Sequence, residues 1–215
     1  SPVVTVNDMR DGGFRIGSVG KALPDTEVKI ADDGEILIKG PQVMQGYYKD
    51  PEQTAEVLKN GYFHTGDIGE TDNDGFLKIT DRKKSMFKTS GGKYVAPQLI
   101  ENAMKQSSFI EQILVVGDGE KMPAALIQPN WEWIKQWSSI KGNDISQDTA
   151  IACKDEKLIS RIQQEIDFHN EGFGNWEKVK TFQLTPDLWS IEAGHLTPTM
   201  KSKRKVIKEM YKDLY

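Results

Sequence analysis

Asp81-Arg82-Lys83-Lys84-Ser85-Met86-Phe87-Lys88-Thr89-Ser90-Gly91-Gly92-Lys93 is the stretch from which the rest of the chain can be interpreted. It is rich in lysine and arginine and has two adjacent glycines near its end. An alternating apolar and polar run at 76–80 predicts a strand before it, and Pro97 opens a predicted helix after it. Glycine lets backbone N–H groups approach a ligand, and basic side chains add charge-assisted hydrogen bonds. The stretch therefore suits phosphate binding, with a solvated basic turn as the alternative.

Composition points to an ordinary folded enzyme or binding domain. The chain has 215 residues and a formal net charge of −4, so global charge does not favour a nucleic-acid partner. Its one cysteine, Cys153, rules out a disulfide within the chain and fits a reducing compartment. No apolar run approaches the roughly 20 residues of a membrane span. We expect a cytoplasmic protein, with peripheral membrane contact left open.

Residues 1–82 carry the signals of short strands joined by turns. Asp50 and Pro51 are typical of the first positions of a helix, as N-cap and first helical residue. We expect a small antiparallel sheet or partial barrel, formed by a hairpin at 27–38, a helix at 51–58 and a hairpin at 68–79.

Residues 83–215 alternate between helix and strand patterns. The amphipathic segment 155–168 places Leu158, Ile159, Ile162 and Ile166 on one stripe. We also expect a terminal helix over 203–214, with Val206, Ile207 and Met210 facing inward. The fold class is therefore α+β, with a small β-rich subdomain followed at residue 83 by an α+β domain whose small sheet is covered by helices. The other elements predicted in this part are helices at 96–106 and from Asn130, and strands at 110–117, 124–128 and 179–184.

Two further stretches change the interpretation of the basic stretch. They are Gly61-Tyr62-Phe63-His64-Thr65-Gly66-Asp67 and Leu196-Thr197-Pro198-Thr199-Met200-Lys201-Ser202-Lys203-Arg204. Together the three resemble the AMP-forming acyl-CoA synthetases (adenylate-forming ligases), and most closely the long-chain fatty acid branch. The resemblance implies that 1–82 is the last, β-rich subdomain of a large adenylation domain and that 83–215 is the mobile C-terminal domain. We therefore expect a fragment, inactive alone, whose partner is the N-terminal domain of the same enzyme.

The resemblance assigns three residues to the nucleotide. Asp67 corresponds to the aspartate that accepts hydrogen bonds from both ribose hydroxyls, and an ionised carboxylate suits a vicinal diol. Arg82 corresponds to an arginine near the ribose and phosphate, where a planar fork of donors is suitable. The alternative for Arg82 is a surface ion pair with Asp81. Ile79 is the third residue expected to contact ATP or AMP.

Four residues receive roles in the second half-reaction. Lys84 corresponds to the hinge about which the C-terminal domain pivots, a mechanical role that requires no particular side chain. Gly91 and Gly92 correspond to the turn that lines the tunnel for the pantetheine arm of coenzyme A, and Lys88 is assigned to the same tunnel. The alternative for the glycines is a plain tight turn.

The resemblance also implies a lysine that acts in adenylation. The family pattern is a threonine, three residues and a lysine before the last helix. Thr199 and Lys203 have this spacing, and Thr197 with Lys201 has it too. We predict Lys203 as the catalytic lysine, with Lys201 as the second choice. The alternative is a solvated basic helix face, the usual meaning of such a charge run.

The implied reaction converts a fatty acid and ATP-Mg²⁺ to acyl-AMP and pyrophosphate, and then transfers the acyl group to coenzyme A. No metal-ligating residue is predicted in this chain. Two alternatives stay open: a ligase that loads a carrier protein, and a non-catalytic interaction module with this fold. His64, His169 and His195 receive no functional role.

Overall fold

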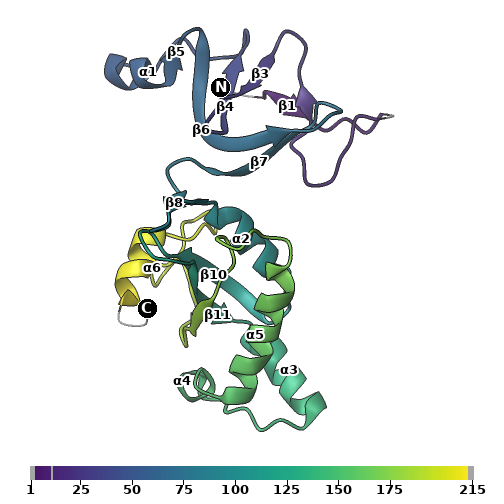
Figure 1. The fold of residues 1–215 in the computed structure, drawn as a ribbon, viewed down its shortest axis with the longest axis vertical. Coiled ribbons are helices and arrows are strands. Elements are labelled where there is room, and N and C mark those ends of the chain that lie inside the picture. Colours follow the sequence, from purple (N-terminus) through teal and green to yellow (C-terminus); the bar gives the residue numbers. More distant parts are fainter. Residues whose placement is uncertain (1–2, 11, 213–215) are drawn as a thin grey trace. The chain divides into compact units, whose positions relative to one another are not determined.

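The computed structural model describes residues 3–10 and 12–212 and has the predicted α+β composition (Figure 1). It divides the chain into two compact units, Ser1–Met86 and Phe87–Tyr215. The division lies at the end of the turn that follows Arg82, whereas the sequence places the boundary directly after Arg82. Each unit is described separately below.

The first unit contains an antiparallel sheet in which the long strand β6 is central. β6 pairs with β4, β5 and β7, and β3 pairs with the other edge of β4. Ile36, Ile38 and Leu77 form its buried core. Both predicted hairpins and the antiparallel sheet are thus confirmed. The elements are β1 Thr5–Val6, β2 Lys21–Ala22, β3 Glu27–Ile30, β4 Glu35–Lys39, α1 Pro51–Val57, β5 Leu58–Lys59, β6 Tyr62–Thr71 and β7 Leu77–Arg82.

Local signals explain most of these elements. The Asp50 side chain accepts a hydrogen bond from the Gln53 N–H, so the predicted N-cap of α1 is confirmed. A register shift between Ile68 and Gly69 makes a bulge where β6 pairs with β7. A Cβ at Gly69 would lie 2.5 Å from the Lys78 carbonyl oxygen, so this close approach requires glycine.

The second unit is a three-stranded sheet in the order β10-β11-β12, antiparallel and then parallel. Helices lie against both of its faces, as predicted (Figure 1). The sequence prediction missed the hairpin of β8 and β9, because the stretch between Met86 and Pro97 was interpreted as a loop. The elements are β8 Phe87–Lys88, β9 Tyr94–Val95, α2 Pro97–Met104, β10 Ile110–Val116, β11 Ala124–Pro129, α3 Trp131–Lys141, α4 Thr149–Ala152, α5 Glu156–Asn170, β12 Thr181–Leu184 and α6 Arg204–Met210.

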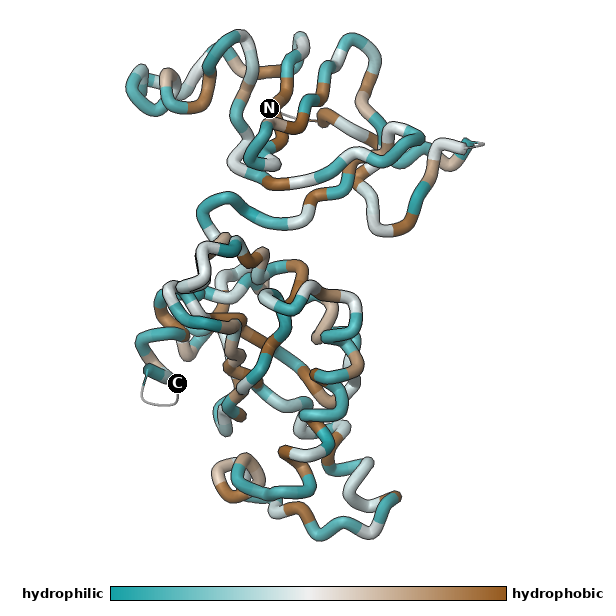
Figure 2. The backbone as a smooth tube through the Cα atoms, in the orientation of Figure 1, coloured by the Kyte–Doolittle hydropathy of each residue, from teal (hydrophilic) through white to brown (hydrophobic). Residues whose placement is uncertain are grey.

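The strand β10 shows why this sheet is apolar on both sides. Ile113 and Val115 face the larger core cluster, with α2, α3 and α5. Leu114 and Val116 face a second cluster that includes Ile207 of α6. A strand covered on both faces reads as a continuous apolar run, which is visible as the hydrophobic central segments of this unit in Figure 2.

Two details of the predicted helix faces were wrong. Val206 and Met210 were expected to point inward with Ile207, but only Ile207 is buried. Ile159 was placed on the buried stripe of α5 and is exposed, whereas Leu158, Ile162 and Ile166 are fully buried. Among the described helices, none is both long enough and apolar enough to cross a bilayer.

Candidate functional site

Asp67 and Arg82 lie opposite each other on β6 and β7 of the first unit. The Arg82 Nε donates to Asp67 Oδ1 at 2.6 Å. The Asp67 side chain is 22% exposed and the Arg82 side chain 65% exposed, so both are accessible to a ligand. Two residues that are 15 positions apart in the sequence thus form one charged surface pair.

The alternative role for Arg82, a surface ion pair with Asp81, does not fit the structure. Asp81 is buried, and its Oδ1 accepts a hydrogen bond from the backbone N–H of Arg82 at 2.5 Å. Ile79 lies on the same strand, and 46% of its surface is exposed. An exposed apolar residue on the strand that presents Arg82 is available for a flat apolar surface such as a nucleobase.

The buried carboxylate of Glu35, which no sequence motif indicated, is hydrogen-bonded to residues next to this pair. Glu35 is only 5% exposed and accepts hydrogen bonds from His64, Gly66 and Lys83. Burial alone would raise the pKa of the Glu35 carboxyl, but these hydrogen bonds, led by that from Lys83, hold the pKa below its usual range. In the sequence, the only signal was a glutamate directly before an apolar strand.

Lys84 lies in a turn that follows β7. The N–H groups of Ser85 and Met86 both donate to the Arg82 carbonyl, at 2.8 and 3.2 Å. The backbone N–H of Lys83, in contrast, donates to Gly66 O at 2.9 Å and so extends the pairing with β6. Lys83 is therefore held by the first sheet, and Lys84 is the next residue, close to where the two units divide.

Gly91 and Gly92 form the turn between β8 and β9 in the second unit. Gly92 has φ +78°, which favours glycine, but Gly91 has no such backbone requirement. A Cβ at Gly91 would have only Thr89 Oγ1, at 3.9 Å, within contact distance. No steric reason within the described structure therefore demands glycine at position 91. Lys88 stands beside this turn, with its Nζ over the Tyr94 ring at 5.4 Å.

The two candidate lysines lie on a hairpin-like loop, residues 196–203, that precedes α6. Leu196 and Ser202 are bridged antiparallel, and the Thr197 N–H donates to the Lys201 carbonyl at 2.8 Å. Lys203 is the N-cap residue of α6, and its N–H donates to His195 O at 2.8 Å. Both lysines are exposed, and neither ammonium group forms an ion pair with the residues that the structure describes.

Buried contacts fix both ends of this lysine loop. Arg204 forms an ion pair with the buried Glu101 of α2 at 2.6 Å and donates to the Val115 carbonyl of β10 at 2.7 Å. His195 stacks with Tyr211, and its Nε2 lies 3.1 Å from the Tyr211 hydroxyl. Burial lowers the pKa of His195. The sequence analysis did not identify these contacts, because they join residues far apart in the chain.

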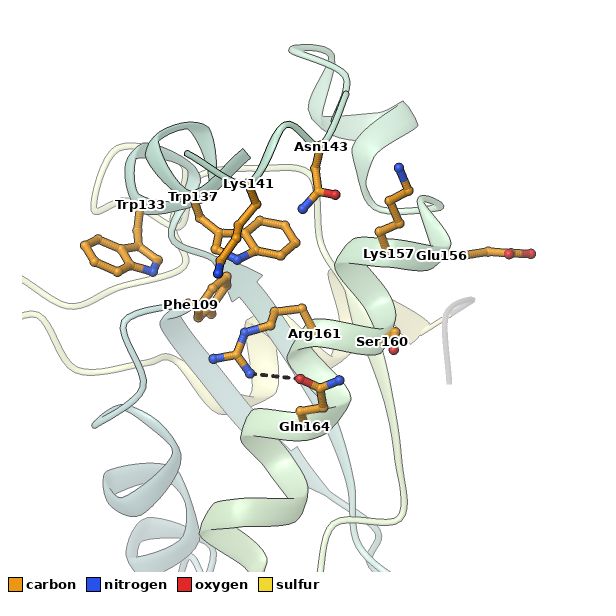
Figure 3. Close-up of a pocket in the computed structure, with 10 residues that line it drawn as sticks. All are labelled: Phe109, Trp133, Trp137, Lys141, Asn143, Glu156, Lys157, Ser160, Arg161 and Gln164. Atoms are coloured by element: carbon orange, nitrogen blue, oxygen red, sulfur yellow. Dashed lines mark hydrogen bonds between the residues drawn. The ribbon is translucent and has the colours of Figure 1, made fainter. Parts of the chain in front are cut away.

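A hollow of about 870 Å³ lies between α3 and α5 (Figure 3). Trp133 and Trp137 line one side, and Arg161 lies on the other. Arg161 is already engaged, because its guanidinium lies 4.5 Å over the Phe109 ring and pairs with Glu165. None of the predicted site residues lines this hollow. It is a groove between helices, separate from the lysine loop.

Comparison with known proteins gives the same family as the motifs. Over 208 residues the chain is 36% identical to the long-chain-fatty-acid–CoA ligase FadD15 of Mycobacterium tuberculosis, covering 97% of this chain and 34% of that protein. It is 37% identical to human long-chain-fatty-acid–CoA ligase 1, covering 95% and 32%. The chain thus spans about a third of the length of these curated relatives.

Solved structures share the fold. The adenylation domain of the carboxylate reductase of Mycobacterium chelonae superposes with a TM-score of 0.72 at 24% identity, over 93% of this chain and 33% of that one. The A-PCP didomain of the Segniliparus rugosus carboxylic acid reductase, solved in complex with AMP, gives 0.69 at 24% identity, over 93% and 29%. Residues 85–214 match the family model described as the AMP-binding enzyme C-terminal domain. The chain therefore belongs to the family of AMP-binding enzymes and contains their C-terminal domain.

Proposed function

We propose that this chain is the C-terminal part of a ligase that activates a long-chain fatty acid with ATP and then transfers the acyl group to coenzyme A. The observation that carries the proposal is the accessible Asp67–Arg82 pair across β6 and β7. The names of the relatives, which are long-chain-fatty-acid–CoA ligases, supply the substrate class. The cytoplasmic location and the peripheral membrane contact stay predictions.

The hydrogen bonding of Asp67 supports a role as a ribose acceptor. Arg82 occupies Oδ1, and no described residue donates to Oδ2. The Oδ2 atom of this partly exposed side chain can accept hydrogen bonds from a vicinal diol. Arg82 pairs with Asp67 through Nε, and the other N–H groups of its guanidinium can donate to a phosphate. Ile79 supplies an apolar contact on the same strand.

The chemistry is leaving-group activation. A carboxylate is a poor electrophile, and an acyl-adenylate is a good one, so the protein contributes positioning and charge stabilisation. A lysine of the 196–203 loop would offset the repulsion between the substrate carboxylate and the α-phosphate. Mg²⁺ would enter with ATP, and no residue of this chain is proposed as its ligand.

We assign the β8–β9 turn to the second half-reaction from the resemblance to the family. Because nothing described within the chain excludes a side chain at Gly91, a requirement for glycine there would come from a ligand or domain that approaches it. The pantetheine arm of coenzyme A is the proposed ligand, with Gly92 and Lys88 beside it.

The proposal is tested by ATP–pyrophosphate exchange with the full-length protein. Exchange should depend on added long-chain fatty acid and should be absent with residues 1–215 alone. Fatty-acid-independent exchange, or none in the full-length protein, would contradict the proposed activation step. Exchange catalysed by residues 1–215 alone would show that the fragment does not need its N-terminal domain.

Asp67→Ala should raise the KM for ATP at least about tenfold, because a hydrogen bond to a charged group contributes about 1.5–3 kcal/mol. Steady-state exchange at varied ATP measures this change. Asp32→Ala, which removes an exposed carboxylate from a turn of the same unit, is the matched control and should leave the KM near the wild-type value. An unchanged KM and kcat in Asp67→Ala would exclude the ribose role.

A further inference from the structure

The buried carboxylate of Glu35 joins two parts of the first unit that the proposed function uses. Its Oε1 accepts a hydrogen bond from the Gly66 N–H at 2.9 Å. Its Oε2 accepts from Lys83 Nζ at 2.9 Å and lies 3.0 Å from His64 Nδ1. Gly66 directly precedes Asp67, and Lys83 lies between Arg82 and Lys84.

These bonds form a closed ring of three residues. The Gly66 carbonyl accepts the Lys83 backbone N–H at 2.9 Å, so Gly66 is held through both of its backbone groups. The Lys83 side chain returns to Glu35 and completes the ring. The ring fixes the segment of β6 that carries Asp67 against the end of β7 that carries Arg82.

Burying the charge of Glu35 costs free energy of desolvation, so this carboxylate is an unfavourable means of holding the β6 segment in place. Desolvation of a carboxylate disfavours burial unless its hydrogen bonds are satisfied, and buried ion pairs are weak evidence for a gain in stability. Lys83 has a second carboxylate partner, since Asp33 Oδ2 lies 2.6 Å from its Nζ. Asp33 is exposed and does not contact Gly66, so it cannot replace Glu35 in the ring.

We infer that Glu35 is a positioning residue that pre-organises Asp67 and Arg82 for the nucleotide and holds Lys83 as the last fixed residue before the hinge. This inference rests on the proposed function. Glu35 touches no substrate; it acts through Gly66, which precedes Asp67 in β6, and through Lys83. Small displacements of positioned groups have large effects on rate, of up to about 10²-fold for 1 Å.

The test uses Glu35→Gln in the full-length protein. The amide keeps the shape of the side chain but loses the charge that holds Lys83 and His64. We expect kcat/KM for ATP in pyrophosphate exchange to fall about 10- to 100-fold. The KM for coenzyme A, measured in the overall reaction, should be unchanged. Asp33→Asn is the matched control, because it removes the exposed partner of Lys83 and leaves the Glu35–Gly66 bond. The kcat/KM for ATP of Asp33→Asn should stay near the wild-type value.

A second variant keeps the inference testable if Glu35→Gln does not fold. Lys83→Gln changes a half-exposed side chain and opens the same ring, so it should lower kcat/KM for ATP in the same direction. A lower melting temperature of Glu35→Gln with unchanged ATP kinetics would overturn the positioning role, as would wild-type ATP kinetics in Lys83→Gln. If Asp67→Ala is impaired but both ring variants are not, this inference fails and the proposed function stands. If Asp67→Ala is also unaffected, the ribose assignment itself fails.

Discussion

Lys203→Ala in the full-length enzyme should lose about 10²–10³-fold in the rate of acyl-AMP formation, the usual effect of removing one charge-stabilising donor from a water-excluded site. It should still convert supplied acyl-AMP and coenzyme A, because the proposed domain rotation carries this lysine away for the second step. Single-turnover assays of the two half-reactions measure this difference.

Lys201→Ala is both the control and the competing assignment. Lys201 lies within the loop and is tied through its backbone to Thr197, whereas Lys203 is the N-cap residue of α6. A cation at a helix N-terminus faces the positive end of the helix dipole, so Lys203 is in the less favourable place for its charge. If Lys201→Ala shows the adenylation defect and Lys203→Ala behaves like the wild type, the assignment of Lys203 is wrong and Lys201 is the adenylation lysine.

Lys84→Pro should separate the half-reactions in a different way. Proline fixes φ near −65° and keeps the preceding residue out of the α region, so one domain arrangement becomes inaccessible. We expect one half-reaction to stay near the wild-type rate and the other to fall by an order of magnitude or more. Presteady-state rates for each half-reaction test this expectation.

The Lys84 N–H donates no hydrogen bond to the described residues, so proline at this position removes none. Lys84→Ala is the matched control, since a hinge needs rotation but no side-chain chemistry. It should retain both half-reactions. Equal loss of both in Lys84→Pro, or a comparable loss in Lys84→Ala, would contradict the hinge assignment.

The helices and hairpins that have local sequence signals, such as N-cap residues and turn residues, were predicted from the sequence. Asp50 caps the helix that it was expected to cap, and both predicted hairpins of the first unit are formed. The β8–β9 hairpin was missed because its strands are two residues long and carry no periodicity. The inward positions of α6 were wrong because the helix is short and contacts the sheet mainly through Ile207.

The site was only partly predictable for a physical reason. Its motifs identified Asp67 and Arg82 one by one, but their contact depends on strand register and on the bulge at Gly69. The Glu35 ring joins residues 31 and 48 positions apart, and the Arg204–Glu101 pair spans 103 positions. Local pattern carries no information on such pairings, so they required the folded structure.

The central claim is that this chain belongs to an enzyme that forms acyl-coenzyme A through acyl-AMP. Mass spectrometry of the full-length protein incubated with a long-chain fatty acid, ATP-Mg²⁺ and either coenzyme A or an acyl carrier protein tests it most directly. We expect AMP and acyl-coenzyme A, with acyl-AMP accumulating when the acceptor is omitted. Acylated carrier protein without acyl-coenzyme A, or ADP in place of AMP, would contradict it.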